Sequence, residues 1–525
     1  MKIKKNNSFV FFQVFTLIYL LTCCVTNATN VKIDKAATIT GANTTDKTAF
    51  ITFDLSWENS WRTSTGSSNY DGVWIFVKYK ENNDTEWKHA HLSATAADYS
   101  ITASNNVSAS FTPGTTDKKV LGVFAYRQKD GTGNINWDEI KMKWNYDADG
   151  IKDINNVTVK VLAIEMVYVP KGAFSVGAGG TEACGFYTYP KTNTPFAINS
   201  ESAITIGQKD GELCFAKHFY AEQYFGTIPA EFPKGFNAFW CMKYELTQGQ
   251  YVEYLNMLTR QQQKVHSSTD ISGTSVKNRF VLSNSATIQD RCGIRCDSVI
   301  SISDPVIFYC DLNGNGIPNE KNDGQNISCN FISWWDDSSF SDWTGLRPMS
   351  ELEFEKACRG PLTPVAEEYP WGSTIIKNTT SILNPGMITE TPSNTEANAI
   401  FGENYVSLGP VRAGFFEKKN GTKEQNGTSY YGIADLGGNL FERVVSVSNK
   451  DGLLFKGSMG DGELNEGGTL LNIDWPASLG IGSGFRGGSF FYSSPYCRTS
   501  DRQYSGLGDW QRFNHYGYRA VRTAE

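Results

Sequence analysis

A single thiol near the C-terminus stands in a setting that suits redox or nucleophilic chemistry. Cys497 lies in the stretch FRGGSFFYSSPYCRTSDR, five residues before Arg502. A cation close to a thiol favours the thiolate, which is the reactive form and a ligand for soft metals. A protein that uses Cys497 and Arg502 for single-thiol redox chemistry is therefore one hypothesis. We favour the alternative that Cys497 is a partly buried structural residue or one half of a disulfide.

A polar stretch in the middle of the chain could bind a hard cation. DLNGNGIPNEKND, residues 311–323, places side-chain oxygens at Asp311, Asn313 and Asn315, with Gly316 in the sixth position. This is the front half of a twelve-residue calcium loop. Position twelve is an asparagine rather than the bidentate glutamate, and a proline opposes the exiting helix of an EF-hand. We predict a short calcium repeat of the extracellular type, with a plain Asn/Gly turn as an equal alternative.

The N-terminal sequence has the pattern of an export signal. A basic start, MKIKKNNS, precedes the apolar run FVFFQVFTLIYLL, which is short for a membrane span. We predict a signal peptide over residues 1–28 and a protein that is extracellular, periplasmic or associated with the outer membrane. Lipid modification of Cys23 or Cys24 is the alternative to plain secretion.

The cysteine count suits an exported protein. Of the 11 cysteines, two lie in the predicted signal and nine remain, so at least one is unpaired if the others form disulfides. Cys292 and Cys296, and then Cys310 and Cys329, lie close together in sequence, so we expect local disulfides there, with a connectivity that the sequence does not determine. The spacing fits no standard zinc pattern, and the chain has only 5 histidines.

The bulk composition narrows the function classes. The formal net charge is -7 and no basic stripe is visible, so we expect no nucleic-acid partner. Aromatic residues make up 13% and glycine occurs 49 times, which is typical of an ordered, loop-rich protein.

Residues 29–160 are predicted to form an all-β sandwich domain. FITFDLSW, GVWIFVKYK and VLGVFAYRQ are short runs rich in β-branched and aromatic residues, separated by turn-forming stretches. The tryptophans of this region are expected mainly in the core, with a carbohydrate-stacking surface as the alternative: Trp57, Trp61, Trp74, Trp87 and Trp144.

Two segments further on carry helix signals. Leu246–Arg260 has apolar residues spaced by three and four, with Thr247 as the N-cap. Arg347–Gly360 contains Ser350 and Glu353, which form the pattern of a capping box.

Several stretches, read in order, resemble the formylglycine-generating enzyme family, also called sulfatase-modifying factors. They are MVYVPKGAFSVG, FWCMKYELTQGQYVEYLN, CNFISWWDDSSFSDWTGLRPMSELEFEKACRG, YPWGS, YGIADLGGNLFERVV, FRGGSFFYSSPYCRTSDR and HYGYRAVR. Phe441 replaces the tryptophan of the family's Gly-Asn-x-Trp-Glu signature. The resemblance covers residues 161–525 and implies a loop-rich α+β domain with a variant of the C-type-lectin fold.

The resemblance implies a chemistry that this chain carries only in part. Family enzymes oxidise a cysteine of a client sulfatase with oxygen and copper, using two thiols on one strand. Cu(I) is a soft ion that prefers thiolates. The first family cysteine falls on Cys497, and the second falls on Arg502, so the pair is broken.

The resemblance also implies calcium. The Gly-Asn-x-Trp-Glu loop of the family binds this ion, and its ligands fall on Asp435, Gly438, Leu440 and Glu442. The first and last would supply carboxylates and the other two main-chain carbonyls, a mixture that suits a hard cation. Asn398 is a candidate for a second family calcium site.

We predict a calcium-stabilised binding or scaffold protein that has lost the second catalytic cysteine. Its partner would be a protein or a glycan, and an association with a bacterial envelope fits the predicted export. The alternative is a copper-dependent formylglycine-generating oxidoreductase with a reorganised site and a sulfatase client. In that case Cys241 or Cys358 would have to lie near Cys497.

Overall fold

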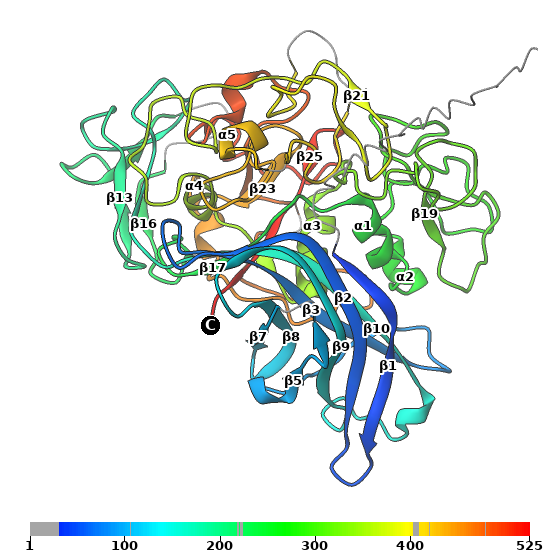
Figure 1. Cartoon of the computed structure of the whole chain (residues 1–525). Coiled ribbons are helices and arrows are strands. Elements are labelled where there is room, and N and C mark those ends of the chain that lie inside the picture. Colours follow the sequence, from blue (N-terminus) through cyan, green and yellow to red (C-terminus); the bar gives the residue numbers. More distant parts are fainter. Residues whose placement is uncertain are drawn as a thin grey trace, which may run out of the picture.

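The computed structural model describes residues 31–104, 107–217, 220, 224–402, 409–418, 420–477 and 479–525. The architecture is mostly β, with few helices and long loops, as predicted (Figure 1). The predicted signal peptide, with Cys23 and Cys24, lies outside the described residues. Within the described ranges, no helix is both long enough and apolar enough to cross a membrane.

Two large sheets organise the N-terminal part and connect it to the rest of the chain. The five-stranded sheet has the order β1-β2-β9-β5, with β6 beside β9. The eight-stranded sheet has the order β20-β26-β17-β10-β3-β8-β7, with β4 beside β3. The first sheet consists of β1 (Lys32–Asn43), β2 (Thr48–Arg62), β5 (Tyr99–Ser100), β6 (Ala103–Ser104) and β9 (Gly131–Asn145). The second consists of β3 (Asp71–Glu81), β4 (Lys88–His89), β7 (Ala109–Thr116), β8 (Lys119–Arg127), β10 (Val157–Val169), β17 (Phe239–Met242), β20 (Arg347–Pro348) and β26 (Ala520–Thr523).

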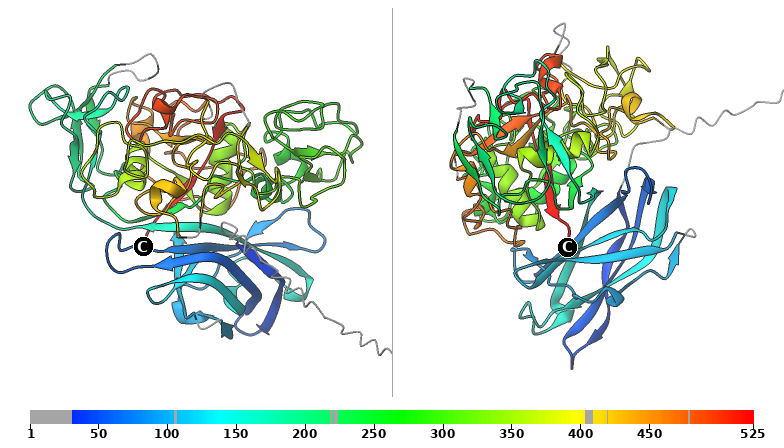
Figure 2. Two further views of the ribbon diagram at one scale, coloured as in Figure 1. Left: turned by 45° about the horizontal axis from the view of Figure 1, so that its top comes forward. Right: turned by 90° about the vertical axis from the view of Figure 1, so that its left-hand side faces the viewer.

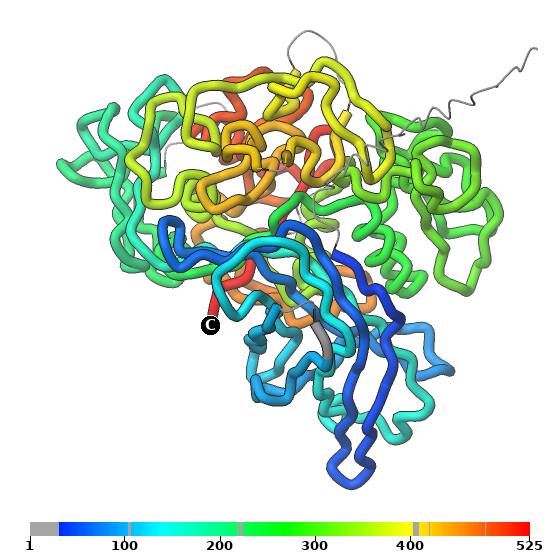
Figure 3. Tube along the Cα trace, in the orientation of Figure 1, coloured from blue at the N-terminus to red at the C-terminus, as the bar shows by residue number. Residues whose placement is uncertain are grey.

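The eight-stranded sheet is built from both ends of the chain. β10 pairs with β3 on one side and with β17 on the other, and β17 pairs in turn with the C-terminal strand β26. Figure 2 shows the blue and cyan strands beneath the loop-rich remainder. Figure 3 shows the red C-terminal segment returning to them. The predicted boundary between residues 160 and 161 falls inside β10.

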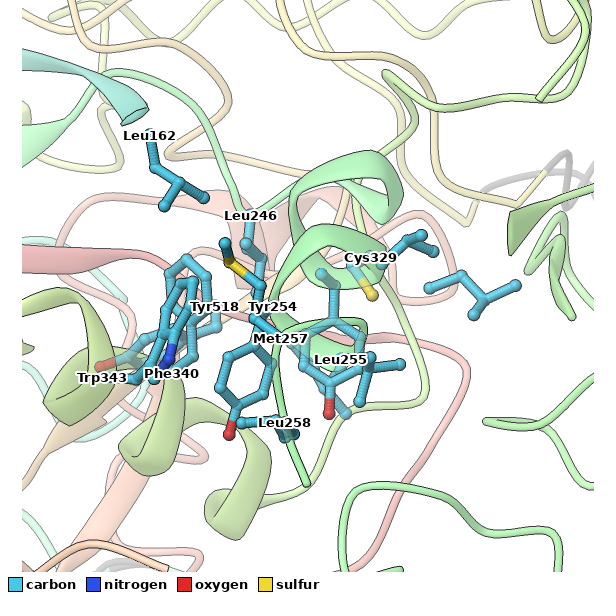
Figure 4. Packing of buried hydrophobic residues seen from close by; sticks show 14 of the residues in the cluster. Leu162, Leu246, Tyr254, Leu255, Met257, Leu258, Cys329, Phe340, Trp343 and Tyr518 are labelled. Atoms are coloured by element: carbon cyan, nitrogen blue, oxygen red, sulfur yellow. The ribbon is translucent and has the colours of Figure 1, made fainter. Parts of the chain in front are cut away.

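Strand β3 is buried on both faces. Val73 and Ile75 pack into a core shared with β2 and β9, whereas Trp74 and Phe76 pack into a second core that includes α1 and α3. Alternate side chains of a strand point to opposite faces, so the sheet separates the two cores. Trp74 also donates its indole N–H to the carbonyl oxygen of Thr344 at 2.9 Å. Figure 4 shows the second core, in which Tyr254 meets rings of α3.

The predicted strands are confirmed, because the three runs named above lie largely within β2, β3 and β8. Three of the five tryptophans are core residues, as expected: Trp57, Trp74 and Trp144 are almost fully buried. Trp61 and Trp87 are only partly buried.

The two predicted helices are present. α1 (Gln248–Leu255) begins after Thr247 and ends earlier than predicted, because Thr259 adopts an extended backbone and caps the separate helix α2 (Arg260–Gln263). α4 (Glu351–Arg359) begins after Ser350, which forms the predicted capping box with Glu353. The remaining helices are α3 (Trp334–Thr344) and α5 (Lys423–Asn426).

Short strands complete the loop-rich part. They form the pairs β11-β13, β18-β19 and β21-β22, the four-stranded sheet β12-β15-β14-β16, and the three-stranded sheet β24-β23-β25. Their bounds are β11 Phe174–Val176, β12 Phe186–Thr188, β13 Phe196–Ile198, β14 Ile204–Ile206, β15 Leu213–Phe215, β16 Gly226–Ile228, β18 Ile294–Cys296, β19 Phe308–Cys310, β21 Ile382–Leu383, β22 Thr391–Pro392, β23 Phe441–Val445, β24 Ser483–Arg486 and β25 Tyr516–Gly517.

A glycine substitution tests the tight packing of the shared sheet. A Cβ added at Gly122 would lie 2.6 Å from the carbonyl oxygen of Ile75 and 2.7 Å from the ring of Trp74. We expect Gly122→Ala to lower the free energy of unfolding by about 2 kcal/mol, because overpacking strains the strand. Gly273→Ala is the matched control, since its Cβ would meet nothing nearer than 4.0 Å. Urea unfolding followed by fluorescence would contradict this packing if both variants unfolded alike.

Candidate functional site

Cys497 is held in a buried and apolar position. It ends the 3₁₀ turn Ser494–Cys497 and is 0% exposed. It packs in a cluster with Tyr369, Trp371 and Phe401. A Cβ on Gly488 would lie 2.8 Å from its sulfur, and Gly488 has a φ of +70°, so glycine is required there on two grounds. The second glycine of the RGGS motif therefore makes room for the thiol.

Arg502 is bound by a carboxylate. Its Nε donates to Glu351 at 2.7 Å and one terminal nitrogen donates to the other oxygen of Glu351 at 2.9 Å. The guanidinium also donates to the carbonyl oxygen of Cys184 and to the hydroxyl of Ser448, each at 2.9 Å. The ring of Phe186 lies 3.7 Å from its central carbon. All three nitrogens of Arg502 are therefore used to hold buried structure together.

Glu351 belongs to a larger buried ion network on α4. Arg486 contacts Glu351 at 3.2 Å and Glu355 at 2.8 Å, and every one of these side chains is 0% exposed. Burial alone would raise the pKa of Glu351, but Arg502 and Arg486 hold the pKa below its ordinary value. The network therefore keeps Glu351 ionised inside the protein.

The other thiols of the family motifs do not join Cys497. Cys241 and Cys358 share one core cluster with Val167 and Phe354, whereas Cys497 belongs to the cluster of Tyr369 and Trp371. The structure therefore places no second motif-borne sulfur in the apolar cluster that surrounds Cys497.

No disulfide joins any of the nine cysteines that the structure describes, so the two expected local disulfides are not formed. Cys296 lies on the extended strand β18. Four residues of extended chain span about 13 Å, far more than a disulfide allows between Cα atoms. The prediction of a disulfide at Cys292 and Cys296, which relied on their closeness in sequence, is therefore wrong. Cys310 and Cys329 are both fully buried in the same core but remain thiols.

The predicted calcium loop brings two buried carboxylates into electrostatic contact. Asp435 has a φ of 59°, and Glu442 lies on β23, opposite Arg486 of β24. Glu442 forms an ion pair with Arg519 at 2.6 Å. Its second oxygen, and one oxygen of Asp435, have no hydrogen-bond partner among the described residues.

The electrostatics of this loop favour a cation. Burial raises the pKa of Asp435 to about 7, with a smaller opposing effect of Arg519 and a further rise from Glu442. Burial, together with Glu442 and Asp435, also raises the pKa of Glu245 well above its ordinary range. The carboxylates of Asp435, Glu442 and Glu245 are thus buried near one positive charge, that of Arg519. A bound cation would offset the remaining negative charge.

The donor set fits the calcium ion that the family implies. Across the described part of the chain, no three His, Cys, Asp or Glu side chains form a metal-holding group. The implied site needs only two carboxylates, Asp435 and Glu442, with carbonyl oxygens of Gly438 and Leu440. The two unpartnered carboxylate oxygens are the observation that supports this fit.

Sequence reasoning missed Glu245 and Arg519. Glu245 accepts the backbone N–H of Leu440 at 3.0 Å and the side-chain amide of Asn439 at 2.5 Å, so it holds the loop. Arg519 donates to Glu442 and to the carbonyl oxygen of Ala434. A sequence signal for both residues existed, because each is a charged residue within a largely apolar stretch. Glu245 lies in FWCMKYEL and Arg519 lies in YGYRAV.

The polar stretch 311–323 forms a turn in which most side-chain polar groups are bonded, although one oxygen of buried Asp323 has no hydrogen-bond partner among the described residues. Asp311 is ion-paired with Arg295 and accepts the N–H of Gly316. Asn313 and Asn315 donate their amides to Glu320 at 3.2 and 2.5 Å. These contacts are those of the Asn/Gly turn, and a calcium ion there stays a prediction.

Asn398 holds neighbouring loops together. Its side-chain oxygen accepts the N–H of Lys377 at 2.7 Å, and its amide donates to the carbonyl oxygen of Glu424 at 2.9 Å. The residue is 3% exposed. A calcium ligand at this position also stays a prediction.

An aromatic patch surrounds Phe441, the residue at the family's tryptophan position. Phe441 contacts the rings of Tyr492, Tyr504 and His515 at 5.1 to 6.0 Å. His515 stacks on Phe491, which is 53% exposed. Burial lowers the pKa of His515 to about 4, so its ring is neutral at neutral pH. The patch can therefore stack against apolar or ring-shaped groups of a ligand.

The fold and site define a loop-rich, mostly β protein whose site is formed by glycine-rich turns. The family described as "Sulfatase-modifying factor enzyme 1-like domain" matches residues 153–524. The match covers well over half of the chain, so the chain belongs to this family, as its motifs predicted. Among curated proteins, no match was found.

A double-mutant cycle tests the ion network. We expect Glu351→Gln and Arg502→Met each to lower the free energy of unfolding by about 3 to 5 kcal/mol, because each takes away one partner of a buried charge. The double variant should lose less than the sum of the two. The exposed pair Lys377 and Glu396, 54% and 77% exposed, is the control, and its cycle should give less than about 1 kcal/mol.

The pH dependence gives a second readout of the same cycle. Since the pKa of Glu351 is lower in the folded protein, its stabilising effect should be complete above its ordinary pKa and decline as the pH falls through the folded value. Urea unfolding should show this decline in the wild type and not in Glu351→Gln. Strict additivity of the cycle at neutral pH, where Glu351 is ionised, would contradict the network.

Proposed function

We propose that this protein is an exported binding or scaffold member of its family that no longer carries out copper chemistry. The observation that carries the proposal is the burial of Arg502 against Glu351. The resemblance implies a second active-site thiol at this position. A fully bonded guanidinium stands there instead, and the folded core depends on it.

The donor set does not fit copper. Cu(I) is held by two soft ligands in the family mechanism, and Cys497 supplies one sulfur. Arg502 supplies a cation, and Cys241 and Cys358 lie in another core cluster. The thiol of Cys497 is also closed to solvent. The proposed function therefore includes no oxidation step through copper.

Calcium fits better, as a structural ion. The carboxylates of Asp435 and Glu442 and the carbonyl oxygens of Gly438 and Leu440 would hold it. When bound, the ion would supply positive charge to a buried loop with excess carboxylates. This loop ends at Phe441, so the ion would stiffen one edge of the aromatic patch.

The proposed ligand is a glycan or a protein that stacks on the aromatic patch. Exposed Phe491 and the rings around His515 give a surface of the kind that sugar rings and aromatic side chains contact. This use is in keeping with a lectin-like fold for residues 161–525 and a β-sandwich for residues 29–160, which we propose as finer descriptions. Export and envelope association are further parts of the proposal, and they rest on the N-terminal sequence.

A copper titration separates this proposal from its alternative, a formylglycine-generating oxidase with a sulfatase client. We expect residues 29–525 to bind no more Cu(I) than a Cys497→Ser variant, because no second thiolate is placed to share the ion. Competition with a colorimetric Cu(I) chelator measures the stoichiometry. Tight binding of one Cu(I) that Cys497→Ser abolishes would overturn the proposal and favour the oxidase.

A calcium-dependent melting experiment tests the structural ion. We expect Ca²⁺ at about a hundred times its dissociation constant to stabilise the wild type by about 2.7 kcal/mol relative to EDTA. Asp435→Asn keeps a residue that tolerates positive φ and removes one ligand charge, so the calcium effect should shrink strongly. Asp311→Asn is the control and should keep the full effect. If only Asp311→Asn abolished the stabilisation by calcium, the ion would bind to residues 311–323 and not to the loop of Asp435 and Glu442.

A further inference from the structure

A cavity of about 540 Å³ lies where the N-terminal strands meet the loops of the family domain. Asn59 and Trp61 at the end of β2 contribute one wall. Another wall comes from Glu417, Lys418 and eight of the residues from Asn420 to Gly432, including Lys423, Tyr430 and Tyr431. Its volume lies within the usual range for small-ligand sites. The cavity is lined by residues other than Cys497, Arg502 and the predicted calcium ligands.

Aromatic rings form part of the lining. Trp61 is partly buried, and a Cβ on Gly432 would come within 3.1 Å of its indole, so the backbone approaches the ring closely. Tyr430 and Tyr431 meet edge to face at 4.9 Å. Flat rings at the wall of an open cavity suit the apolar face of a sugar ring.

The charge of the lining is positive. Lys243 is neutralised by Glu165 at 3.1 Å and Glu417 at 3.6 Å. Lys418 and Lys423, in contrast, have no ion-pair partner within the described ranges. Lys418 donates to the carbonyl oxygens of Ala397 and Gln425, and Lys423 donates to that of Tyr430.

Lys418 is partly buried and Lys423 is exposed as a residue, but carbonyl oxygens and neighbouring chain partly desolvate both ammonium groups. Burial lowers the pKa values of Lys418 and Lys423 below their ordinary range, as expected for cations without a counter-charge. The chain as a whole carries a formal net charge of -7, so the cavity is a cationic site on an acidic protein. An anionic group entering the cavity would supply the missing counter-charge.

We propose that this cavity binds an acidic saccharide. Its sugar ring would stack on Trp61, and its carboxylate or sulfate would be bound by Lys418 and Lys423. A neutral sugar would leave the lysines without a counter-charge, and a simple inorganic anion would not use the aromatic wall. This inference rests on the proposed binding function and adds a ligand class and a second site to it.

Calorimetric titration of the whole chain tests the proposal with defined probes. The probes are a galacturonate tetrasaccharide, a chondroitin sulfate tetrasaccharide and neutral cellotetraose. We expect at least one of the two acidic probes to bind, with an affinity that falls as salt rises, and the neutral probe not to bind. The two acidic probes distinguish a uronate from a sulfated sugar as the source of the charge.

Two variants connect binding to this cavity. Lys423→Met should weaken the acidic probe about tenfold, because a charge-assisted hydrogen bond is lost. Lys456→Met, at an exposed lysine outside the cavity lining, is the matched control and should leave binding unchanged. Trp61→Phe should weaken binding of the acidic probe without changing the melting temperature. An unchanged melting temperature would show that the weaker binding does not come from loss of the fold.

Three results would overturn the proposal: equal binding of the neutral probe, binding unaffected by Lys423→Met, or no binding of any probe. None of these results affects the copper titration. The absence of saccharide binding in the cavity would therefore leave the proposed binding or scaffold function intact. Tight Cu(I) binding through Cys497 would overturn that proposal and leave the saccharide result as a property of the cavity alone.

Discussion

The structure depends on keeping the charges of α4 paired inside the protein. All nine residues of this helix are buried, including Glu351, Glu353, Glu355 and Arg359. A buried charge costs several kcal/mol unless it is paired. Two partners come from residues close to the helix in sequence, since Arg347 binds Glu353 and Glu368 binds Arg359. Two come from the C-terminal RGGS motif region, since Arg486 binds Glu351 and Glu355, and Arg502 binds Glu351. The helix therefore ties the C-terminal motif to the middle of the chain.

The same network bears on the proposed loss of the copper chemistry. Arg502 stands where the family resemblance implies a thiol, and its charge is paired with Glu351. Returning a cysteine to residue 502 would leave Glu351 with Arg486 alone and would open space between Phe186 and Phe215. Recovering a thiol pair thus requires several coordinated changes in the core. The proposed binding surface needs no such change, because alternate side chains of β23 point to opposite faces: Phe441 belongs to the aromatic patch, and Glu442 belongs to the ion-paired interior.

Much of the local structure could be predicted from the sequence, because its signals are local. The N-cap at Thr247, the capping box at Ser350, the strand runs and the family motifs depend on neighbouring residues. The shared sheet was harder, although GVWIFVKYK is a nearly continuous apolar run, which is typical of a strand buried on both faces. The pairing of Glu442 with Arg519 joins residues far apart in the chain, and no sequence spacing reveals it. The disulfide prediction failed for the same reason, since it assumed that neighbours in sequence are neighbours in space.

The shared sheet also determines how firmly the cavity walls are held. Asn69, in the turn after β2, donates to the carbonyl oxygen of Tyr431 at 2.7 Å, and buried Lys78 of β3 donates to that of Gly462 at 2.6 Å. Trp74 adds a third bond between the two parts at Thr344. These contacts join the N-terminal strands to the family domain at several points, so the two walls form one packed body. A ligand that enters between such walls loses little affinity to rearrangement, because the site is formed before it binds.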